Sequence, residues 1–269
     1  RQPVPWHFGS WESGIREAYR MKIVAGLGSI DEYRRFADAG ADEFFCGYVP
    51  YSWAKKYGTV LPLNRREVLC YNVQLGAFSE LEILSELVKK YGKPVHLTFN
   101  SLYYTPEQYP EIGEIISRCV QLGFHSYIIA DPALLVYLRE KGINCEIHLS
   151  GECGEVNSRM VAVFDKKIGL KRVIFHRKNT FEDMRAVAEK CEIPEREAFV
   201  LNEMCQFTGA FCNSLHCDEM GYLCRVPYEL GTIKTVKTDS QKLEKPASDS
   251  DEMISVSRLE PSDPAYDPT

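Results

Sequence analysis

Several patterns that would place a chain in a common functional class are missing from these 269 residues. No run of about eighteen apolar residues is present, so we predict no membrane-spanning helix. The first apolar segment is followed by "GLGS", which is too short to be the G-x-G-x-x-G of dinucleotide-binding folds. G-x-S-x-G and H-E-x-x-H are also missing, and no nucleophile–base pair is evident, which argues against common hydrolase classes.

The chain also has little positive charge to offer a nucleic acid. Its formal net charge is -6, and residues 239–269 contribute most of it, with eight acidic and three basic side chains. The remainder is close to neutral, which argues against a large electrostatic surface for nucleic acid but not against a local basic patch. The first residues lack the apolar segment of a signal peptide, and we expect a cytoplasmic, reducing location.

Cysteine, in contrast, is abundant and partly clustered. Four of the ten cysteines are spaced Cys205-x6-Cys212-x4-Cys217-x6-Cys224, whereas C-x2-C and C-x3-C-x2-C do not occur. Structural zinc sites commonly use a C-x2-C pair, so the wider spacing favours an iron–sulfur cluster over zinc. The scattered thiols Cys46, Cys119, Cys145 and Cys191 are expected to pack in the core, as is Cys70 on weaker grounds.

Short apolar segments alternate with amphipathic ones from residue 21 onward. The pattern predicts strands at 21–27, 42–48, 94–100, 126–131, 145–150, 171–176 and 197–202, and helices at 29–40, 80–93, 109–123, 132–142, 158–169 and 180–191. The strands read as apolar on both faces, as in parallel sheets covered by helices. We predict an α/β fold, a TIM-barrel-like (β/α) barrel whose last unit is missing or irregular, rather than an open doubly wound sheet.

Three regions follow from this pattern. Residues 1–20 form an N-terminal extension, residues 21–230 form the barrel with the cysteine cluster after the seventh strand, and residues 231–269 form an acidic tail. The tail is rich in Ser, Asp, Pro and Lys, which predicts an extended or disordered segment.

Polar residues gather where the predicted strands end, which is where barrels place their active sites. We predict catalytic roles for Glu152, His176, Arg177 and Glu203, and substrate binding by Asn100, Asp131, Ser150 and Asn157. Arg177 could hold a carboxylate or phosphate with two hydrogen bonds. The structural alternatives are that Asp131 caps a helix and Ser150 caps a turn. His96 and His148 lie inside strands and are expected to be satisfied core residues.

Seven segments in order resemble the peptidase U32 family: "AGADEFFCGY", "LTFNSLYYTPEQ", "GFHSYIIADPALL", "CEIHLSGECGEVNS", "LKRVIFHRKNTFEDM", "FVLNEMCQFTGAFC" and "CRVPYEL". The resemblance covers roughly residues 22–230. The chain departs from the family pattern at "SGE", where "STQ" is usual, and at "LNEMC". We expect the family's extra C-terminal domain to be missing.

The resemblance implies a TIM-barrel-like fold and a [4Fe-4S] cluster held by Cys205, Cys212, Cys217 and Cys224. It further implies oxygen-independent hydroxylation of an RNA base or of a small aromatic or quinone precursor, with prephenate as the oxygen donor. Some family members work as hetero-oligomers with a second U32-like subunit. Two alternatives stay open, namely a collagenase-like U32 peptidase and a non-catalytic subunit that carries the cluster.

Overall fold

The computed structural model describes residues 21–58, 63–65, 74–154 and 156–200, together with the backbone of two later strands. The chain divides into two compact units, Arg1–Ala210 and Phe211–Thr269. In the first unit, seven strands form one parallel sheet in the order β1-β2-β3-β4-β5-β6-β7, which is also their order in the sequence. The strands are β1 Val24–Gly26, β2 Glu43–Gly47, β3 Val95–Phe99, β4 Ser126–Ile129, β5 Glu146–Leu149, β6 Leu170–Ile174 and β7 Glu195–Glu197.

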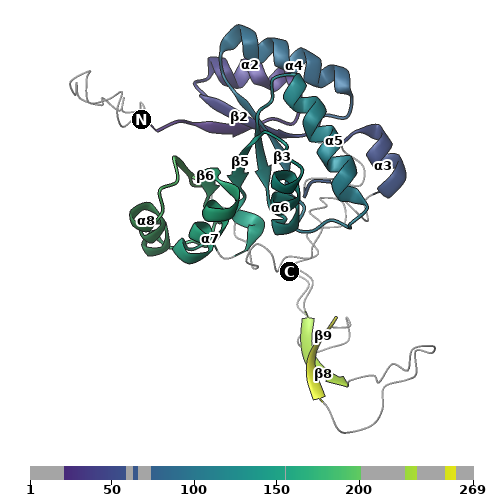
Figure 1. Ribbon diagram of the computed structural model, residues 1–269, viewed down its shortest axis with the longest axis vertical. Helices are drawn as coiled ribbons and strands as arrows, with labels where there is room; N and C mark the ends of the chain where they lie inside the picture. The colour runs from purple at the N-terminus through teal and green to yellow at the C-terminus, as the bar shows by residue number, and fades with distance from the viewer. Residues whose placement is uncertain are drawn as a thin grey trace, which may run out of the picture. The chain divides into compact units, whose positions relative to one another are not determined.

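Helices connect the strands and cover the outside of the sheet (Figure 1). They are α2 Ile30–Asp38, α3 Tyr51–Tyr57, α4 Phe78–Tyr91, α5 Gln108–Gln121, α6 Pro132–Glu140, α7 Ser158–Ile168 and α8 Phe181–Lys190, and a 3-10 turn, η1, spans Gly151–Cys153. The sequential strand order is that of a barrel and excludes a doubly wound sheet. The barrel prediction is therefore confirmed, as a curled half-barrel in which the described strands β1 and β7 do not pair.

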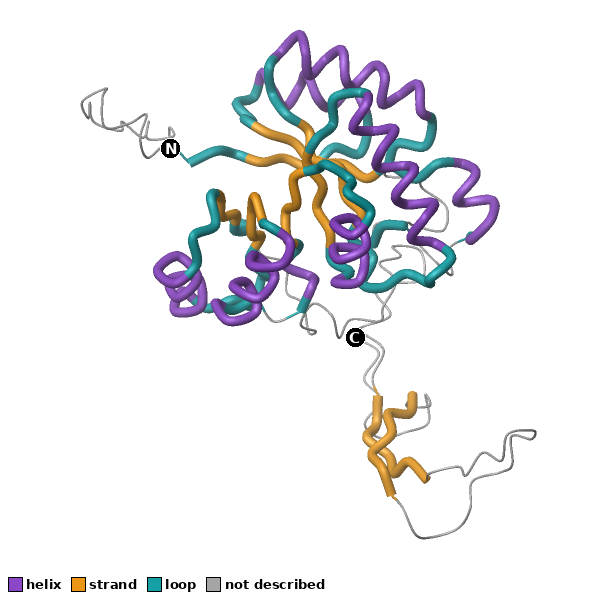
Figure 2. Tube along the Cα trace, in the orientation of Figure 1, coloured by secondary structure: helices purple, strands orange, loops and turns teal. Residues whose placement is uncertain are grey.

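Side chains from distant strands meet on the concave face and show how strongly the sheet curls. Glu43 on β2 and Arg172 on β6 are 2.6 Å apart, although four strand spacings would separate them by about 19 Å in a flat sheet. Figure 2 shows the strands gathered at the centre with the helices around them. Lys22, just before β1, also reaches Glu195 on β7 at 3.7 Å.

The two faces of the sheet differ in polarity, which the sequence analysis did not predict. Residues that face the helices are apolar and buried, for example Phe44, Leu97, Tyr127, Leu149 and Val173. The alternate positions on the concave face carry Glu43, His96, Ser126, His148 and Arg172, all of them buried. The prediction of strands apolar on both faces was therefore wrong for β2 to β6, because each of these strands places at least one buried polar side chain on its inner face.

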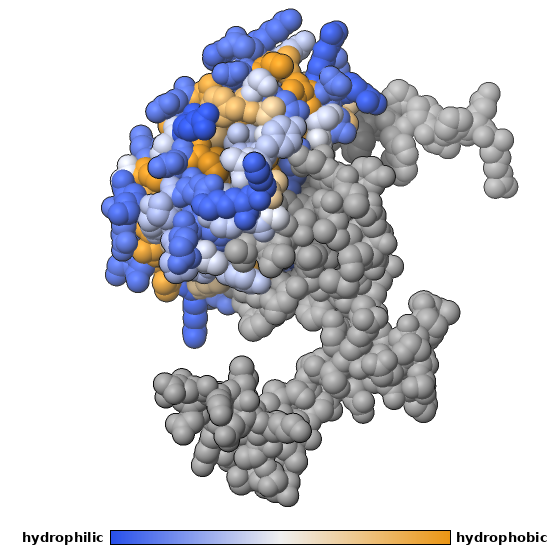
Figure 3. All heavy atoms as spheres, turned by 90° about the vertical axis from the view of Figure 1, so that its right-hand side faces the viewer, coloured by the Kyte–Doolittle hydropathy of each residue, from blue (hydrophilic) through white to orange (hydrophobic). Residues whose placement is uncertain are grey.

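The helices follow the usual rule for a covering layer. Their buried residues, such as Tyr33, Leu84, Ile112, Ile116 and Leu138, pack against the sheet. Figure 3 shows one exterior face on which hydrophilic side chains predominate and hydrophobic ones form small patches. None of the helices in the described ranges combines the length and hydrophobicity needed to cross a membrane.

Two elements differ from the sequence predictions. Helix α3 lies in the connection after β2, where we predicted no helix. The seventh strand spans Glu195–Glu197 and not 197–202, because Glu195 and Glu197 both bind Arg172 inside the barrel. The polar sequence "ERE" gives no sign of a strand until that partner is known.

In the second unit, β8 Tyr228–Lys234 pairs with β9 Glu252–Arg258 as an antiparallel hairpin. Strand β9 and part of β8 fall within residues 231–269, the range for which we predicted an extended or disordered tail.

Candidate functional site

The candidate site lies at the carboxyl ends of β3, β5 and β6. Asn100, Ser150 and His176 follow these strands at positions that alternate in phase with the inward-facing His96, His148 and Arg172. They therefore belong to the concave side at its C-terminal rim, where barrel enzymes assemble their sites.

Glu152 is the centre of this arrangement. Its carboxylate lies 3.7 Å from Arg177 Nη1, 3.9 Å from His176 Nε2 and 3.9 Å from Arg65 Nη2. All four side chains are largely shielded from solvent, with the exposed fraction at most 19%. Two guanidinium groups around one carboxylate leave a local excess of positive charge, which suits an anionic ligand.

A close backbone contact holds Glu152 beside His176. A Cβ atom on Gly151 would lie 2.8 Å from the His176 backbone nitrogen and 2.9 Å from the Ile174 carbonyl oxygen. Only glycine fits this contact without a shift of one of the two backbones. Ser150 Oγ then accepts the Glu152 N–H at 3.2 Å, which fixes the start of η1.

The hydrogen bonds of His176 determine which ring nitrogen carries the proton. Nδ1 accepts from the Lys178 N–H at 3.2 Å, so a neutral imidazole carries its proton on Nε2, the nitrogen that faces Glu152. The His176 backbone N–H donates to Asn179 Oδ1 at 2.8 Å, and Asn179 Nδ2 donates to the Val156 carbonyl at 2.8 Å. The ring is thereby held by the loop after β6.

Arg65 is a member of the site that sequence reasoning missed. Its backbone N–H donates to Asn100 Oδ1 at 3.2 Å, and the Asn100 N–H donates to Asn64 Oδ1 at 3.3 Å. These bonds attach the short segment 63–65 to the end of β3 and bring the guanidinium to Glu152. Residues 63–65 have no periodic pattern in the sequence, so no local signal could have found them.

A small cavity of about 20 Å³ lies beneath this segment, between the ends of β1, β2 and β3. Asn64, Gln74, Thr98 and Asn100 contribute its polar lining. Its volume suffices for roughly one water molecule.

Three of the residues predicted to bind substrate make structural hydrogen bonds. Asp131 accepts from the Ala133 N–H at 2.8 Å, the Tyr104 N–H at 3.1 Å and the Tyr109 hydroxyl at 2.9 Å, and burial raises its pKa. Asn157 Oδ1 caps α7 through Arg159 N and Met160 N, and Ser150 caps η1. Their substrate-binding roles stay predictions.

Other predicted residues lie outside the described part of the chain, namely Glu203, Cys205, Cys212, Cys217, Cys224 and Cys70. The described cysteines Cys46, Cys119, Cys145, Cys153 and Cys191 are buried and free. In the ranges the structure describes, no group of three or more His, Cys, Asp or Glu residues could hold a metal ion. The assignment of metal ligands therefore stays a prediction on the four clustered cysteines.

The profile of peptidase family U32 matches residues 28–261. This chain belongs to the U32 family. It is 26% identical over 184 residues to tRNA hydroxylation protein P1 of Bacillus subtilis, a match that covers 68% of this chain and 39% of that protein. It is 25% identical over 194 residues to tRNA hydroxylation protein P of Escherichia coli, covering 72% of this chain and 39% of that protein. The chain thus spans about two fifths of the length of these relatives.

Among solved structures, a U32 peptidase aligns with a TM-score of 0.48 and 16% identity, over 72% of this chain and 73% of that one.

Proposed function

We propose that this chain belongs to an iron–sulfur-dependent enzyme that hydroxylates a base of tRNA without molecular oxygen. The substrate class is supported by the names of the curated relatives, which are tRNA hydroxylation proteins in three bacteria. The structural observation that carries the proposal is the convergence of Glu152 with Arg65, His176 and Arg177 at the strand ends. Such an enzyme would act in the cytoplasm, where tRNA is found.

The geometry supports separate roles for these side chains. Arg65 and Arg177 would hold an anionic oxygen donor, for which prephenate with its carboxylates is the candidate that the family resemblance suggests. His176 would donate a hydrogen bond from Nε2–H, and Glu152 would accept a proton at its carboxylate. In the absence of the donor, Glu152 partly neutralises the two guanidinium groups.

Cys205, Cys212, Cys217 and Cys224 would hold the cluster, on the grounds of their spacing and of the family resemblance. A bound cluster would supply electron transfer or a Lewis-acidic iron. These four residues follow β7 in the sequence and lie outside the described ranges.

A peptidase reaction with Cys46 or Cys153 as the nucleophile is supported less well. Burial raises the pKa of the Cys46 and Cys153 thiols to about 12, so very little thiolate would be present near neutral pH.

A role as a non-catalytic subunit is a separate alternative. Bacillus subtilis has two relatives, tRNA hydroxylation proteins P1 and P2, which supports assembly with a second U32-like subunit.

The proposal is tested in an Escherichia coli strain that lacks tRNA hydroxylation protein P. Expression of the full-length protein is expected to restore the hydroxylated nucleoside, measured by mass spectrometry of digested tRNA. The variant Arg177→Ala should abolish restoration and leave the visible spectrum of the anaerobically purified protein unchanged. Arg159→Ala, which alters an exposed arginine on α7, is the matched control and should behave as wild type.

Iron-loaded wild-type protein that restores no hydroxylated nucleoside, alone or with the second subunit, would contradict the proposal. Hydrolysis of a peptide substrate by the same preparation would support the peptidase alternative instead.

A further inference from the structure

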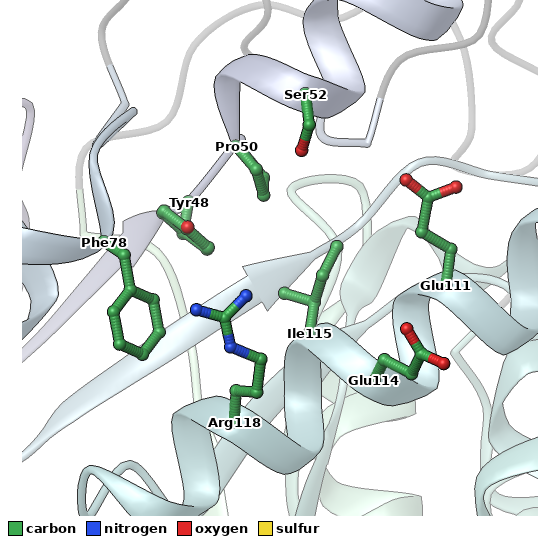
Figure 4. Close-up of a pocket in the computed structure, with 8 residues that line it drawn as sticks. All are labelled: Tyr48, Pro50, Ser52, Phe78, Glu111, Glu114, Ile115 and Arg118. Atoms are coloured by element: carbon green, nitrogen blue, oxygen red, sulfur yellow. The ribbon is translucent and has the colours of Figure 1, made fainter.

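A second pocket lies outside the barrel, on the surface formed by α3, α4 and α5. It encloses about 150 Å³ and is lined by the end of the loop after β2, the first residues of α3 and α4, and one face of α5 (Figure 4). Ile115 on α5 and Pro50 form part of its apolar wall. Its volume is about half that of the smallest pockets that take drug-sized ligands, so it would accept only a small molecule.

One end of the pocket is positively charged. The Arg118 guanidinium lies over the ring of Phe78, with Cζ 4.3 Å from the ring centre, and Figure 4 shows it directed toward the space beside Tyr48. This cation–π contact fixes the position of the guanidinium but uses none of its N–H donors. The described residues provide no hydrogen-bond or ion-pair partner for these donors.

The other end is acidic. The carboxylates of Glu111 and Glu114 lie across the pocket from Phe78 (Figure 4). Glu111 is bound to Lys56 at 2.8 Å and to the Tyr57 hydroxyl at 3.0 Å. Glu114 has no such partner in the described part of the chain, so this end keeps a net negative charge.

Glu114 and Arg118 would be expected to pair with each other. They are four residues apart on one helix with the acid on the N-terminal side, which is the favourable arrangement for an ion pair. The two groups nevertheless lie more than the 4 Å of an ion pair apart, with the guanidinium turned onto Phe78. The pocket therefore presents two opposite charges that do not satisfy each other.

Tyr48 adds a polar group to the lining of the pocket. Its side chain lines the pocket and is only 4% exposed. The hydroxyl has no hydrogen-bond partner among the described residues and is not one of the side-chain atoms that are fully shielded from solvent, so it opens onto the pocket. A ligand atom in the pocket would supply that partner next to the Arg118 guanidinium.

We propose that this pocket binds a small zwitterion of the α-amino acid class. The carboxylate of the ligand would accept hydrogen bonds from Arg118 and from the Tyr48 hydroxyl, and its ammonium group would donate to Glu114. The carboxylates of Glu111 and Glu114 disfavour a phosphate or an RNA backbone, and Arg118 disfavours a simple cation. The site is distinct from the Glu152 site, and the proposal does not depend on the proposed function.

The test is a binding titration of the full-length protein, in which binding is detected by ligand-observed NMR. The probes are glycine, L-alanine and L-serine, with acetate and methylammonium as analogues that carry only one of the two charges. Arg118→Gln and Glu114→Gln remove one charge each from exposed positions, so the fold should be retained. Arg185→Gln and Glu189→Gln make the same changes on the exposed face of α8 and are the matched controls.

Wild-type protein and both α8 controls should bind at least one of the amino acids at millimolar concentration. Each α5 variant should lose at least about ten-fold in affinity, because one charge-assisted contact is removed. Tyr48→Phe should show a smaller loss, and the single-charge analogues should not compete. The proposal is overturned if none of the three amino acids binds to wild type, or if the α5 variants bind as tightly as the α8 controls.

Discussion

Arg172 is the residue on which the polar interior of the barrel depends. It is 4% exposed and binds Glu43 at 2.6 Å, Glu197 at 2.9 Å and also Glu195. Three carboxylates thus share one guanidinium, with additional contacts from Lys22 and His96 to Glu43. We expect Arg172→Met to lower the free energy of unfolding by about 3–5 kcal/mol, because it removes the buried cation that the buried Glu43 shares with the partly exposed Glu195 and Glu197. Urea unfolding followed by circular dichroism measures the change.

The control for this prediction is Arg34→Met, on the exposed face of α2, where the ion pair with Asp38 spans 3.6 Å. A surface pair of this kind contributes at most about 1 kcal/mol. The double variant Arg172→Met/Glu43→Gln should recover part of the loss, since the buried charge of Glu43 is removed together with its partner. Equal losses for Arg172→Met and Arg34→Met would show that the network contributes little to stability.

His148 links this interior to pH. Its side chain is 1% exposed, as expected of a core histidine, but its Nδ1 has no hydrogen-bond partner among the described residues, so the expectation that it is satisfied does not hold there. His96 meets that expectation, with Nδ1 2.5 Å from Ser126 Oγ and Nε2 3.1 Å from Glu43 Oε2. Burial, with smaller contributions from His96 and Arg172, lowers the pKa of His148 from 6.5 to about 2.

The sign of the pH effect follows from this lowered pKa. Below pH 6.5 the unfolded chain binds a proton at His148 and the folded chain does not, so stability is lost progressively as the pH falls toward about 2. The free energy of unfolding therefore falls with falling pH. We expect His148→Gln to make this dependence on pH less steep, by up to about 1.4 kcal/mol per pH unit between roughly pH 6 and pH 5. His125→Gln, which alters an exposed histidine, is the matched control. Parallel slopes for His148→Gln and wild type would refute this account.

At the scale of elements, Asn157 caps helix α7 and was also predicted to bind substrate, and these two roles can be tested separately. Its side chain accepts from Arg159 N at 3.1 Å and from Met160 N at 3.0 Å, at the first turn of α7. We expect Asn157→Ala to cost about 0.5–2 kcal/mol of stability, whereas Asn157→Asp should keep the cap and most of the stability. Thermal unfolding of the wild type, Asn157→Ala and Asn157→Asp measures the difference in stability.

The same variants separate the two roles in the tRNA assay. If Asn157 only caps α7, Asn157→Asp should restore tRNA hydroxylation as well as wild type does. A loss of hydroxylation in a stable Asn157→Asp protein would show that the amide itself contacts the substrate.

The sequence predicts most of the elements because each has a local cause. Ser29 lies at the N-cap of α2, Gly92 ends α4 in a left-handed conformation, and Asp131 before Pro132 starts α6, all readable from residue type and spacing. Strand β7 and helix α3 have no such cause. Glu195 and Glu197 occupy a strand because Arg172 lies opposite them. Helix α3 contributes Trp53, which is completely buried, but this packing depends on the tertiary structure and cannot be read from the local sequence.

At the scale of the whole molecule, the curl of the sheet decides which residues share a site. The strand-end rule brings Glu152, His176 and Arg177 together from the sequence alone, because β5 and β6 are neighbours. It cannot place Arg65, which contacts Glu152 from the connection between β2 and β3. The sequence of that connection has no pattern that predicts where Arg65 lies. The polar interior was missed for a similar reason, since Glu43 and Arg172 are 129 positions apart and meet only in a curled sheet.

The remaining prediction concerns the proposed iron–sulfur cluster. Cys46 and Cys119 lie within β2 and α5, Cys145 directly precedes β5, and Cys191 ends α8; all four are buried, and burial raises the pKa of their thiols. A protonated thiol in an apolar core is a poor metal ligand. We therefore expect Cys46→Ala and Cys119→Ala to keep the iron content of anaerobically purified wild type.

Cys205→Ala, Cys212→Ala, Cys217→Ala and Cys224→Ala are each expected to lower the iron content and the visible absorption, because a thiolate ligand is removed. Iron analysis of each variant, with circular dichroism to verify that it is folded, provides the measurement. The core variants are the matched controls, since they remove the same thiol group from a position without a proposed ligand role. Loss of iron from a folded Cys46→Ala protein, or full iron content in the Cys205→Ala protein, would show that the ligands have been assigned to the wrong cysteines.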